Sequence, residues 1–429
     1  MARAVVRKGA ALARIGAALA ALLAAAAVRA DAPRIPWIDE GDVPLASWSR
    51  SVSPHPDARQ HPGDLVLFQA PNRASGRRGV TAPGATLPLF GAKRGGGCAG
   101  RWLLVGPQAW ACSDDADVRA DEPSAPVPVL REDGLLREYF FVAPQGASAY
   151  ADLQAVEEGT SDRELEGRWG VAGVRERTVA GERWVETSKG LWIAARDLGA
   201  ARPSLFHGEA LGEGPLDLAW VLPDRAQVFP EPSPKAKSKD ARARFQLVHV
   251  AEERAGYSKI GEGAWMLSRD LARPHVAPPP AEVTRDGERW IDVELATQTL
   301  VAYEGARPVF ATLVSTGRGA PGTDSATPPG VHRIWVKILA SDMDNVERDD
   351  LDAHYSLEDV PYVQFFDKAV ALHGTYWHRD FGRVKSHGCV NLAPKDARWL
   401  FDFTGPHLPP GWVAAYPEST DPGTAVRVR

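Results

Sequence analysis

The residues best suited to chemistry lie within 19 positions near the carboxyl end of the chain. Two segments, 373–378 (HGTYWH) and 386–391 (SHGCVN), contain three His residues and one Cys. A neighbouring imidazole can accept the proton of a cysteine thiol and stabilise the thiolate as an ion pair. Backbone N–H groups in a tight turn can stabilise an oxyanion, and Gly388 permits such a turn. The sequence therefore contains the parts of a cysteine acyl-transfer site around Cys389.

Two other interpretations of the same residues stay open at this point. His373, His387 and Cys389 could be zinc ligands, although no other Cys lies nearby and the spacing is not that of a zinc finger. Cys389 could also be an inert buried thiol. Acyl transfer is favoured, and it requires no metal and no organic cofactor.

A longer pattern makes the interpretation specific. The pattern begins with His-Gly-Thr at His373 and ends with Ser-His-Gly-Cys-x-Asn from Ser386, with twelve residues at 374–385 between His373 and Ser386. This pattern resembles the L,D-transpeptidase (YkuD-type) catalytic domain. The sequences STG at 315–317 and TPPG at 327–330 resemble two further signatures of that family, and 290–303 resembles its opening strands. The resemblance covers about 285–418. It implies a mainly β fold, with a C-terminal β-sandwich of the L,D-transpeptidase type and a short helix.

The resemblance also implies a role for each residue around the thiol. Cys389 is expected to be the nucleophile and His373 the general base, with the carbonyl of Gly374 fixing the tautomer of the imidazole. The N–H groups of His387, Gly388 and Cys389 are expected to form the oxyanion hole.

Substrate-binding roles are less sharply indicated. Many relatives carry Arg where this chain has Asn391, so the charge that would bind the donor carboxylate must come from elsewhere. For several of these residues, packing or a solvent-facing position is the alternative. The residues expected to support the turn or contact substrate are Ser386, Asn391, Tyr376, Trp377, Arg379, Arg383 and Lys385.

The implied activity is that of an exported peptidoglycan L,D-transpeptidase. Cys389 would attack the carbonyl between residues three and four of a tetrapeptide stem and pass the acyl group to an amine of a neighbouring stem. The product would be a 3–3 crosslink, and carbapenem-type β-lactams would acylate the same thiol. Water or a protein amine as acceptor is one alternative, giving a carboxypeptidase or an anchoring enzyme. A non-catalytic scaffold that binds the cell wall is another.

Upstream, the chain divides at Pro- and Gly-rich stretches. We expect a signal peptide at 1–30, for which a retained membrane anchor is the alternative, and an N-terminal extension at 31–61. A Gly-x-Trp-apolar pattern followed by Asp recurs around Trp192 and Trp265, and more faintly around Trp110. It resembles bacterial SH3-like repeats, which predicts three small β-barrels that bind glycan or peptide or act as spacers. The expected ranges are 62–122, 135–200 and 212–273, then a Pro-rich linker at 274–284, the catalytic domain at 285–418 and a tail at 419–429.

The net charge and the cysteine content argue against some classes of protein and predict one disulfide. The net charge of -5 gives no electrostatic argument for nucleic-acid binding, and no apolar run reaches the ~20 residues of a spanning helix. Export implies an oxidising compartment, so Cys98 and Cys112 are expected to form a disulfide and Cys389 to stay free.

Within the catalytic segment, strands are expected at 300–303 and 309–314, joined by a hairpin turn, and at 331–338. The acidic run 342–359 is expected to be a surface loop. It could instead attract the amine of a substrate, whereas a calcium loop would need a glycine that is missing. A helix is expected at 394–403.

Overall fold

The computed structural model describes residues 51–55, 64–125, 131–346 and 354–429. The chain divides into two compact units, 1–44 and 45–429, and all described residues belong to the second. The expected signal peptide and most of the N-terminal extension lie outside the described residues. Within the described ranges, no helix is both long and apolar enough to cross a membrane.

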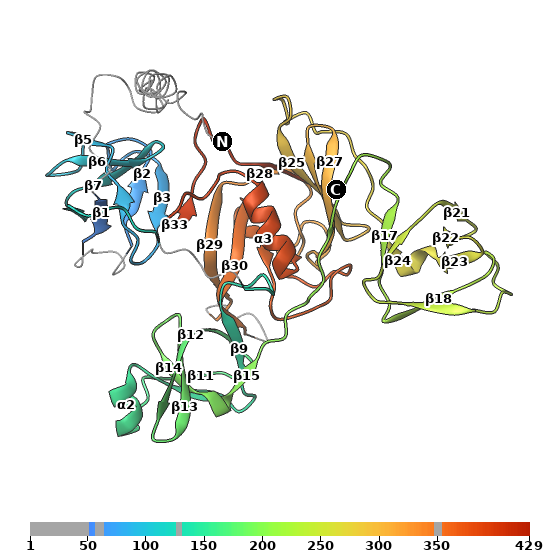
Figure 1. Cartoon of the computed structure of the whole chain (residues 1–429), viewed down its shortest axis with the longest axis horizontal. Coiled ribbons are helices and arrows are strands. Elements are labelled where there is room, and N and C mark those ends of the chain that lie inside the picture. Colours follow the sequence, from blue (N-terminus) through green and yellow to red (C-terminus); the bar gives the residue numbers. More distant parts are fainter. Residues whose placement is uncertain (1–50, 56–63, 126–130, 347–353) are drawn as a thin grey trace, which may run out of the picture. The chain divides into compact units, whose positions relative to one another are not determined.

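Three groups of short strands precede the catalytic segment, in the ranges where the sequence predicts small β domains (Figure 1). The first group begins earlier than predicted, because Val52 is fully buried and pairs with Val118. Its strands are β1 (Ser51–Pro54), β2 (Val66–Phe68), β3 (Arg77–Thr81), β4 (Leu87–Pro88), β5 (Gly91–Lys93), β6 (Trp102–Gly106), β7 (Ala109–Cys112) and β8 (Ala116–Arg119). The predicted disulfide between Cys98 and Cys112 is present.

The second and third groups show what the internal repeat encodes. Trp192 and Trp265 are both buried in a short strand, and a single 3₁₀ turn follows each strand. The second group contains β9 (Glu138–Val142), β10 (Ala147–Tyr150), α2 (Leu153–Glu158), β11 (Arg163–Leu165), β12 (Gly170–Val179), β13 (Glu182–Thr187), β14 (Trp192–Ala194) and β15 (Leu198–Ala200). After β16 (Glu209–Ala210), the third contains β17 (Leu218–Val221), β18 (Arg225–Val228), β19 (Asp240–Ala243), β20 (Leu247–His249), β21 (Glu252–Arg254), β22 (Tyr257–Gly261), β23 (Ala264–Leu267) and β24 (Leu271–Ala272).

The catalytic segment is built from two sheets that share one long strand. Its elements are β25 (Arg289–Glu294), β26 (Thr299–Glu304), β27 (Arg307–Ser315), β28 (Gly330–Arg333), β29 (Val336–Asp344), β30 (Ser356–Asp367), β31 (Val370–Gly374), β32 (Val390–Leu392), α3 (Pro394–Phe403), β33 (Trp412–Ala415) and β34 (Ala425–Val428). One sheet has the order β28-β34-β25-β26-β27, and the other the order β27-β32-β31-β30-β29-β33. Strand β27 pairs with β26 along its length and with β32 at its carboxyl end.

The core lies where the two sheets and the helix meet. Helix α3 packs over the sheet that contains β29 and β30 (Figure 1), and Ala397 and Leu400 on its inner face are fully buried. They contact the apolar cluster of both sheets, which includes Ile291, Val314 and Leu372. The helix therefore fixes the sheet that carries the reactive residues.

Several sequence predictions for this segment are confirmed and two are wrong. The helix at 394–403 and the hairpin of β26 and β27 are present. The single strand predicted at 331–338 is two strands, because the chain changes sheets: the N–H of Ile334 bonds to Thr424 and the N–H of Trp335 bonds to Phe365. The predicted tail at 419–429 contains β34, which pairs with both β25 and β28 and belongs to the core sheet.

The two described ends of the acidic run are strands and not surface loop. Its two ends belong to the antiparallel pair β29–β30, with Met343 opposite Leu357 and Asp344 opposite Ser356. Residues 347–353 lie outside the described residues.

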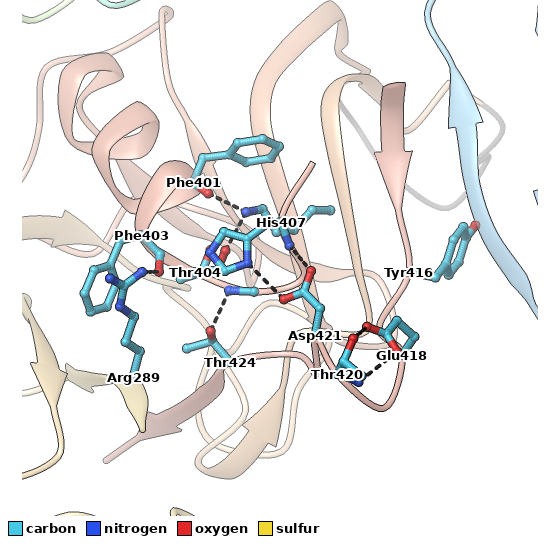
Figure 2. Close-up of polar contacts among 12 residues, drawn as sticks. Arg289, Phe401, Phe403, Thr404, His407, Tyr416, Glu418, Thr420, Asp421 and Thr424 are labelled. Carbon is cyan, nitrogen blue, oxygen red and sulfur yellow. Dashed lines mark hydrogen bonds and ion pairs between the residues drawn. The ribbon is translucent and has the colours of Figure 1, made fainter. Parts of the chain in front are cut away.

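A buried lysine completes the carboxyl end of α3. The Lys337 ammonium donates hydrogen bonds to the carbonyls of Phe401 and Thr404, the latter at 2.8 Å. Burial lowers the pKa of Lys337 to about 7. His407 lies in the turn that follows α3. Its backbone N–H donates a hydrogen bond to the carboxylate of Asp421 at 2.6 Å, and its ring lies 2.9 Å from the same carboxylate (Figure 2). The helix end therefore has partners for carbonyls that a helix leaves unpaired.

Candidate active site

Strands β31 and β32 bring the reactive residues together. The two strands are parallel, and His373 on β31 lies directly opposite Asn391 on β32. Cys389 precedes β32 and is two residues before Asn391, so both side chains emerge on the same face of the sheet. His373 and Cys389 are therefore diagonal neighbours on one face, a separation that a long side chain such as imidazole can bridge.

The hydrogen bonds of His373 define its tautomer. Its side chain is 2% exposed, and Nδ1 lies 3.0 Å from the carbonyl oxygen of Gly374. A carbonyl only accepts, so Nδ1 carries the hydrogen and Nε2 keeps a lone pair. Burial lowers the pKa of His373 to about 4. Trp377 stacks against the imidazole with ring centroids 5.6 Å apart, so His373 is a neutral, oriented base.

Cys389 is a half-buried free thiol. Its sulfur lies 3.8 Å from the carbonyl oxygen of Ala369. Burial raises the pKa of the Cys389 thiol above its ordinary value of 9.0, and a hydrogen bond from the backbone of Ala371 opposes this effect. Both members of the pair are thus shifted toward their neutral forms. This differs from the ion pair expected from the sequence, because burial disfavours both charges.

The turn before Cys389 depends on a glycine and on two hydroxyl groups. Gly388 has φ +134°, a conformation that side chains rarely adopt. The Ser386 hydroxyl accepts a hydrogen bond from the N–H of Gly388 at 3.1 Å and donates one to the carbonyl of Cys389. The Thr327 hydroxyl donates to the carbonyl of Gly388 at 2.6 Å. Because its N–H is engaged by Ser386, Gly388 is not a free oxyanion donor here, which leaves the N–H groups of His387 and Cys389.

The Ser-Thr-Gly signature holds the segment that leads into this turn. The Ser315 hydroxyl donates to the carbonyl of Asp380 at 2.7 Å. The carbonyl of Thr316 accepts hydrogen bonds from the N–H groups of Lys385 and Ser386, at 3.0 and 3.1 Å. The N–H of Gly317 donates to the Thr327 hydroxyl at 2.8 Å, so both signatures support the same turn.

Asn391 is buried beneath the site and contacts a second imidazole. Its side chain is 3% exposed, and Nδ2 lies 2.8 Å from Nε2 of His378. Among the described residues, its Oδ1 has no hydrogen-bond partner although it is buried. Nδ1 of His378 accepts a hydrogen bond from the N–H of Asp380 at 3.1 Å, and burial lowers the pKa of His378 to about 4.

His387 lies at the rim of the site. Its ring stacks on Tyr355 with centroids 5.9 Å apart, and its Nε2 contacts the guanidinium of Arg318. Burial and the neighbouring Arg318 lower the pKa of His387. A cation beside Nε2 also argues against the zinc alternative, since it would repel a metal ion. Tyr355 belongs to the acidic run and directly precedes β30, so this run contacts the nucleophile turn.

The remaining predicted substrate contacts fall into two groups. Tyr376 is 1% exposed, packs against Val360 and Ala371, and donates a hydrogen bond to the carbonyl of Glu358 at 3.2 Å. Apolar packing removes its ring from the surface, which agrees with the packing alternative that the sequence leaves open. Trp377, in contrast, lies against His373. The exposed cationic residues are Arg379, Arg383 and Lys385, of which Lys385 pairs with Asp380 at 2.9 Å.

Three residues that contact the site in the structure have no role assigned to them from the sequence. His378 belongs to the reactive segment, but its spacing gives no sign that it bonds to Asn391. Thr327 belongs to a recognised signature, but its bond to Gly388 needs the folded loop. Tyr355 follows residues that the acidic composition marks only as surface. A signal for Thr327 was present in the signature, whereas the other two contacts depend on folding.

One family model matches the carboxyl-terminal part of the chain. Residues 288–428 match the family model of the L,D-transpeptidase catalytic domain. A search of curated proteins finds no match.

Similar solved structures include three L,D-transpeptidases. The one from Stackebrandtia nassauensis is 28% identical and aligns over 34% of this chain and 57% of that chain, with a TM-score of 0.23. A mutant of the Enterococcus faecium enzyme is 22% identical over 33% of this chain and 50% of that one, with a TM-score of 0.25. L,D-transpeptidase 3 from Mycobacterium tuberculosis is 19% identical over 33% and 60%, with a TM-score of 0.26. The alignments span 50–60% of the length of these three solved chains, so the match to the family model is the basis for relating this chain to the family.

Proposed function

We propose that this chain, whose residues 288–428 belong to the L,D-transpeptidase catalytic domain family, is an exported peptidoglycan L,D-transpeptidase of the cell envelope. The acyl donor would be a tetrapeptide stem and the acceptor an amine of a neighbouring stem. The product would be a 3–3 crosslink.

One observation carries the proposal. The parallel register of β31 and β32 puts the His373 imidazole and the Cys389 thiol on the same face of the sheet. The Gly374 carbonyl holds Nδ1–H of His373 and leaves Nε2 as the basic atom. A free thiol beside a neutral base of fixed tautomer is the arrangement that nucleophilic acyl transfer requires.

The first half of the reaction forms a thioester. Nε2 of His373 takes the thiol proton as Cys389 Sγ attacks the carbonyl carbon of residue three, and the carbonyl oxygen becomes an oxyanion. The N–H groups of His387 and Cys389 would donate to that oxygen. When the intermediate collapses, the C–N bond breaks, and His373 returns the proton to the amine of the departing D-alanine.

The second half transfers the acyl group. The acceptor amine attacks the thioester carbon and gives a proton to His373, and the C–S bond breaks to regenerate the thiol. Asp344 on β29 pairs with Ser356 on β30, next to Tyr355, which stacks on His387. We infer that this acidic hairpin favours approach of a cationic amine, because opposite charges attract at short range. A carbapenem-type β-lactam would stop the reaction by acylating Cys389.

The deciding experiment is mass spectrometry of the products from a purified disaccharide-tetrapeptide. Wild-type protein and a Cys389→Ala variant are compared under the same conditions. A crosslinked dimer formed by the wild type alone supports transpeptidation with Cys389 as nucleophile.

The other outcomes point to the alternatives. Tripeptide without dimer would favour a carboxypeptidase or a protein amine as acceptor. Dimer formed equally by Cys389→Ala would remove the thiol from the mechanism. No product from either protein, together with retention on isolated cell walls, would favour a binding scaffold in which the small β domains contact glycan or peptide.

A further inference from the structure

An aromatic contact joins the second β domain (β9–β15) to the catalytic segment. Tyr139 on β9 stacks on Tyr376, with ring centroids 4.0 Å apart and ring planes 20° apart. Both rings are buried, and they belong to one apolar cluster with Ala172 of β12 and Val360 of β30. Residues 45–429 form one compact unit, and this cluster is part of its interior. The second β domain therefore packs directly on the sheet that carries the reactive residues.

Hydrogen bonds to consecutive carbonyls of β30 hold the two tyrosine rings side by side. The Tyr139 hydroxyl donates to the carbonyl of Asp359 at 2.6 Å, and the Tyr376 hydroxyl donates to the carbonyl of Glu358 at 3.2 Å. Burial raises the pKa of both phenols, so both hydroxyls remain donors at neutral pH. The Arg137 guanidinium adds an ion pair with the Asp359 carboxylate at 3.2 Å.

A glycine allows the close approach of the two parts. Gly170 on β12 forms a parallel bridge with Leu357 on β30. A Cβ at Gly170 would lie 2.6 Å from the hydroxyl oxygen of Tyr376 and 2.9 Å from Cδ2 of Leu357. Non-bonded carbon atoms prefer ~3.5–4.0 Å, so even a methyl group here would push on Tyr376. The backbone of the second β domain is thus in direct contact with that ring.

The contacts continue from Tyr376 to the proposed base. Tyr376 meets Trp377 edge to face, with centroids 5.1 Å apart, and Trp377 stacks on His373. The Gly374 carbonyl engages Nδ1 of His373, but one hydrogen bond does not fix the plane of the ring. Trp377 restrains that plane and so the direction in which Nε2 points. A misplacement of ~1 Å at reacting groups can cost ~10²-fold in rate, so this restraint matters for proton transfer.

We propose that Tyr139 of the second β domain is a positioning residue, which holds Tyr376 and Trp377 and, through them, the plane of the His373 imidazole. The second β domain is then a working part of the active site and not only a spacer or a ligand-binding module. The consequence for catalysis rests on the proposed function, whereas the restraint on the imidazole does not. Coupling of this kind is carried by continuous packing, which the buried cluster around both tyrosines supplies.

The first test observes the imidazole without any turnover. An indole ring shifts the proton resonances of an imidazole that stacks on it, so ¹H–¹³C NMR of the histidine rings in the full-length protein reports on the Trp377 contact. A His373→Gln protein, which lacks one set of ring signals, gives the assignment. We expect the His373 ring signals to move toward those of a free histidine in Tyr139→Leu. They should stay close to wild type in Tyr139→Phe, which keeps the stacked ring and loses only the hydroxyl.

The second test measures kcat and KM for the tetrapeptide in the same variants. We expect kcat to fall about tenfold in Tyr139→Leu and to stay within about threefold of wild type in Tyr139→Phe, with KM changing less than kcat because no substrate contact is lost. Tyr150→Leu is the control, because Tyr150 packs edge to face on Trp184 within the second β domain, with centroids 5.3 Å apart. It should keep the wild-type kcat. Thermal unfolding shows that each variant is folded at the assay temperature.

Two glycines of β12 test the same contact by adding a methyl group. Gly170→Ala pushes on Tyr376, whereas a Cβ at Gly173 would lie 2.8 Å from a ring carbon of Phe140, inside the second β domain. We expect Gly170→Ala to shift the His373 signals and lower kcat as Tyr139→Leu does, and Gly173→Ala to do neither. Wild-type signals and kcat in Tyr139→Leu and Gly170→Ala, or equal losses in the two control variants, would overturn the positioning role.

The two proposals fail in different ways. Absence of turnover in the wild type, with the expected NMR shifts in Tyr139→Leu, would overturn the proposed function and the catalytic role of Tyr139 but leave the restraint on the imidazole standing. Normal turnover in the wild type, with His373 signals that do not respond to Tyr139→Leu or Gly170→Ala, would overturn the positioning role alone.

Discussion

The protonation state of Cys389 can be tested by the rate at which the thiol is alkylated. Only the thiolate reacts, so the rate follows the thiolate fraction. The structure buries both the thiol and the imidazole, which raises the pKa of Cys389 above 9.0 and lowers the pKa of His373 to about 4. We therefore expect the alkylation rate to rise about tenfold per pH unit from pH 6 to pH 9, without a plateau at neutral pH.

The size of the effect follows from the imidazole. Lowering the pKa of His373 from 6.5 to about 4 disfavours its protonated form by about 3 kcal/mol at 1.36 kcal/mol per unit. Burial also raises the pKa of Cys389, so the neutral pair is favoured over the ion pair before attack. His373 must remove the proton during attack and not before it.

The assay is iodoacetamide labelling of the native protein, followed by intact mass between pH 5 and 10. Cys389→Ala gives the background, and the disulfide keeps Cys98 and Cys112 from reacting. A His373→Ala protein should show nearly the same pH profile as wild type while losing turnover. A constant rate between pH 6 and 8 in wild type, with the slope restored in His373→Ala, would refute the reasoning and establish the ion pair.

Three further measurements test the support of the site. Thr327→Val removes the hydroxyl that bonds to Gly388 and Gly317, so we expect a loss of ~1–3 kcal/mol in unfolding free energy and a lower kcat by product assay; unchanged kcat would separate this turn from catalysis. The folded pKa of Lys337, about 7, lies below its unfolded value, so the unfolded state binds more protons and stability should rise with pH from about 7 toward 10. Lys337→Met should abolish up to about 1.4 kcal/mol per pH unit of that slope in urea titrations, and an identical slope would contradict the assignment. Replacing Cys98 and Cys112 together by Ser should cost ~3 kcal/mol in the first β domain and leave Cys389 alkylation unchanged, as thermal unfolding and labelling would show.

The sequence predicts well those features that a local pattern determines. The helix at 394–403 has Pro at its start, an apolar face and a Gly-Pro stop, and α3 has these bounds. The hairpin turn at 304–306 joins β26 and β27 as expected. The disulfide of Cys98 and Cys112 is present as predicted from the expected export and the short spacing.

Features that depend on distant partners were predicted less well. β34 looks like a tail in the sequence, because four residues before the end carry no pattern of their own. It is a core strand because β25 and β28 both bond to it. For Tyr376 the sequence leaves a cleft position and a packed position open, and the packing of β30 and β31 buries its ring.

The folded site also shows features that the sequence motif alone does not, because they depend on burial and on contacts between distant residues. Residue types at 373 and 389 indicate a base and a nucleophile, but the motif cannot show which charges they carry. Burial decides this, and it shifts both groups toward neutrality. Nor can the motif show that His378 meets Asn391, because that contact exists only once β31 and β32 pair in parallel register. A neutral thiol must be deprotonated within the reaction, so the orientation of each hydrogen around Cys389 affects the rate directly. The backbone carbonyl of Gly374 orients one imidazole and the N–H of Asp380 orients the other, and the chemistry of the site follows from those two main-chain contacts.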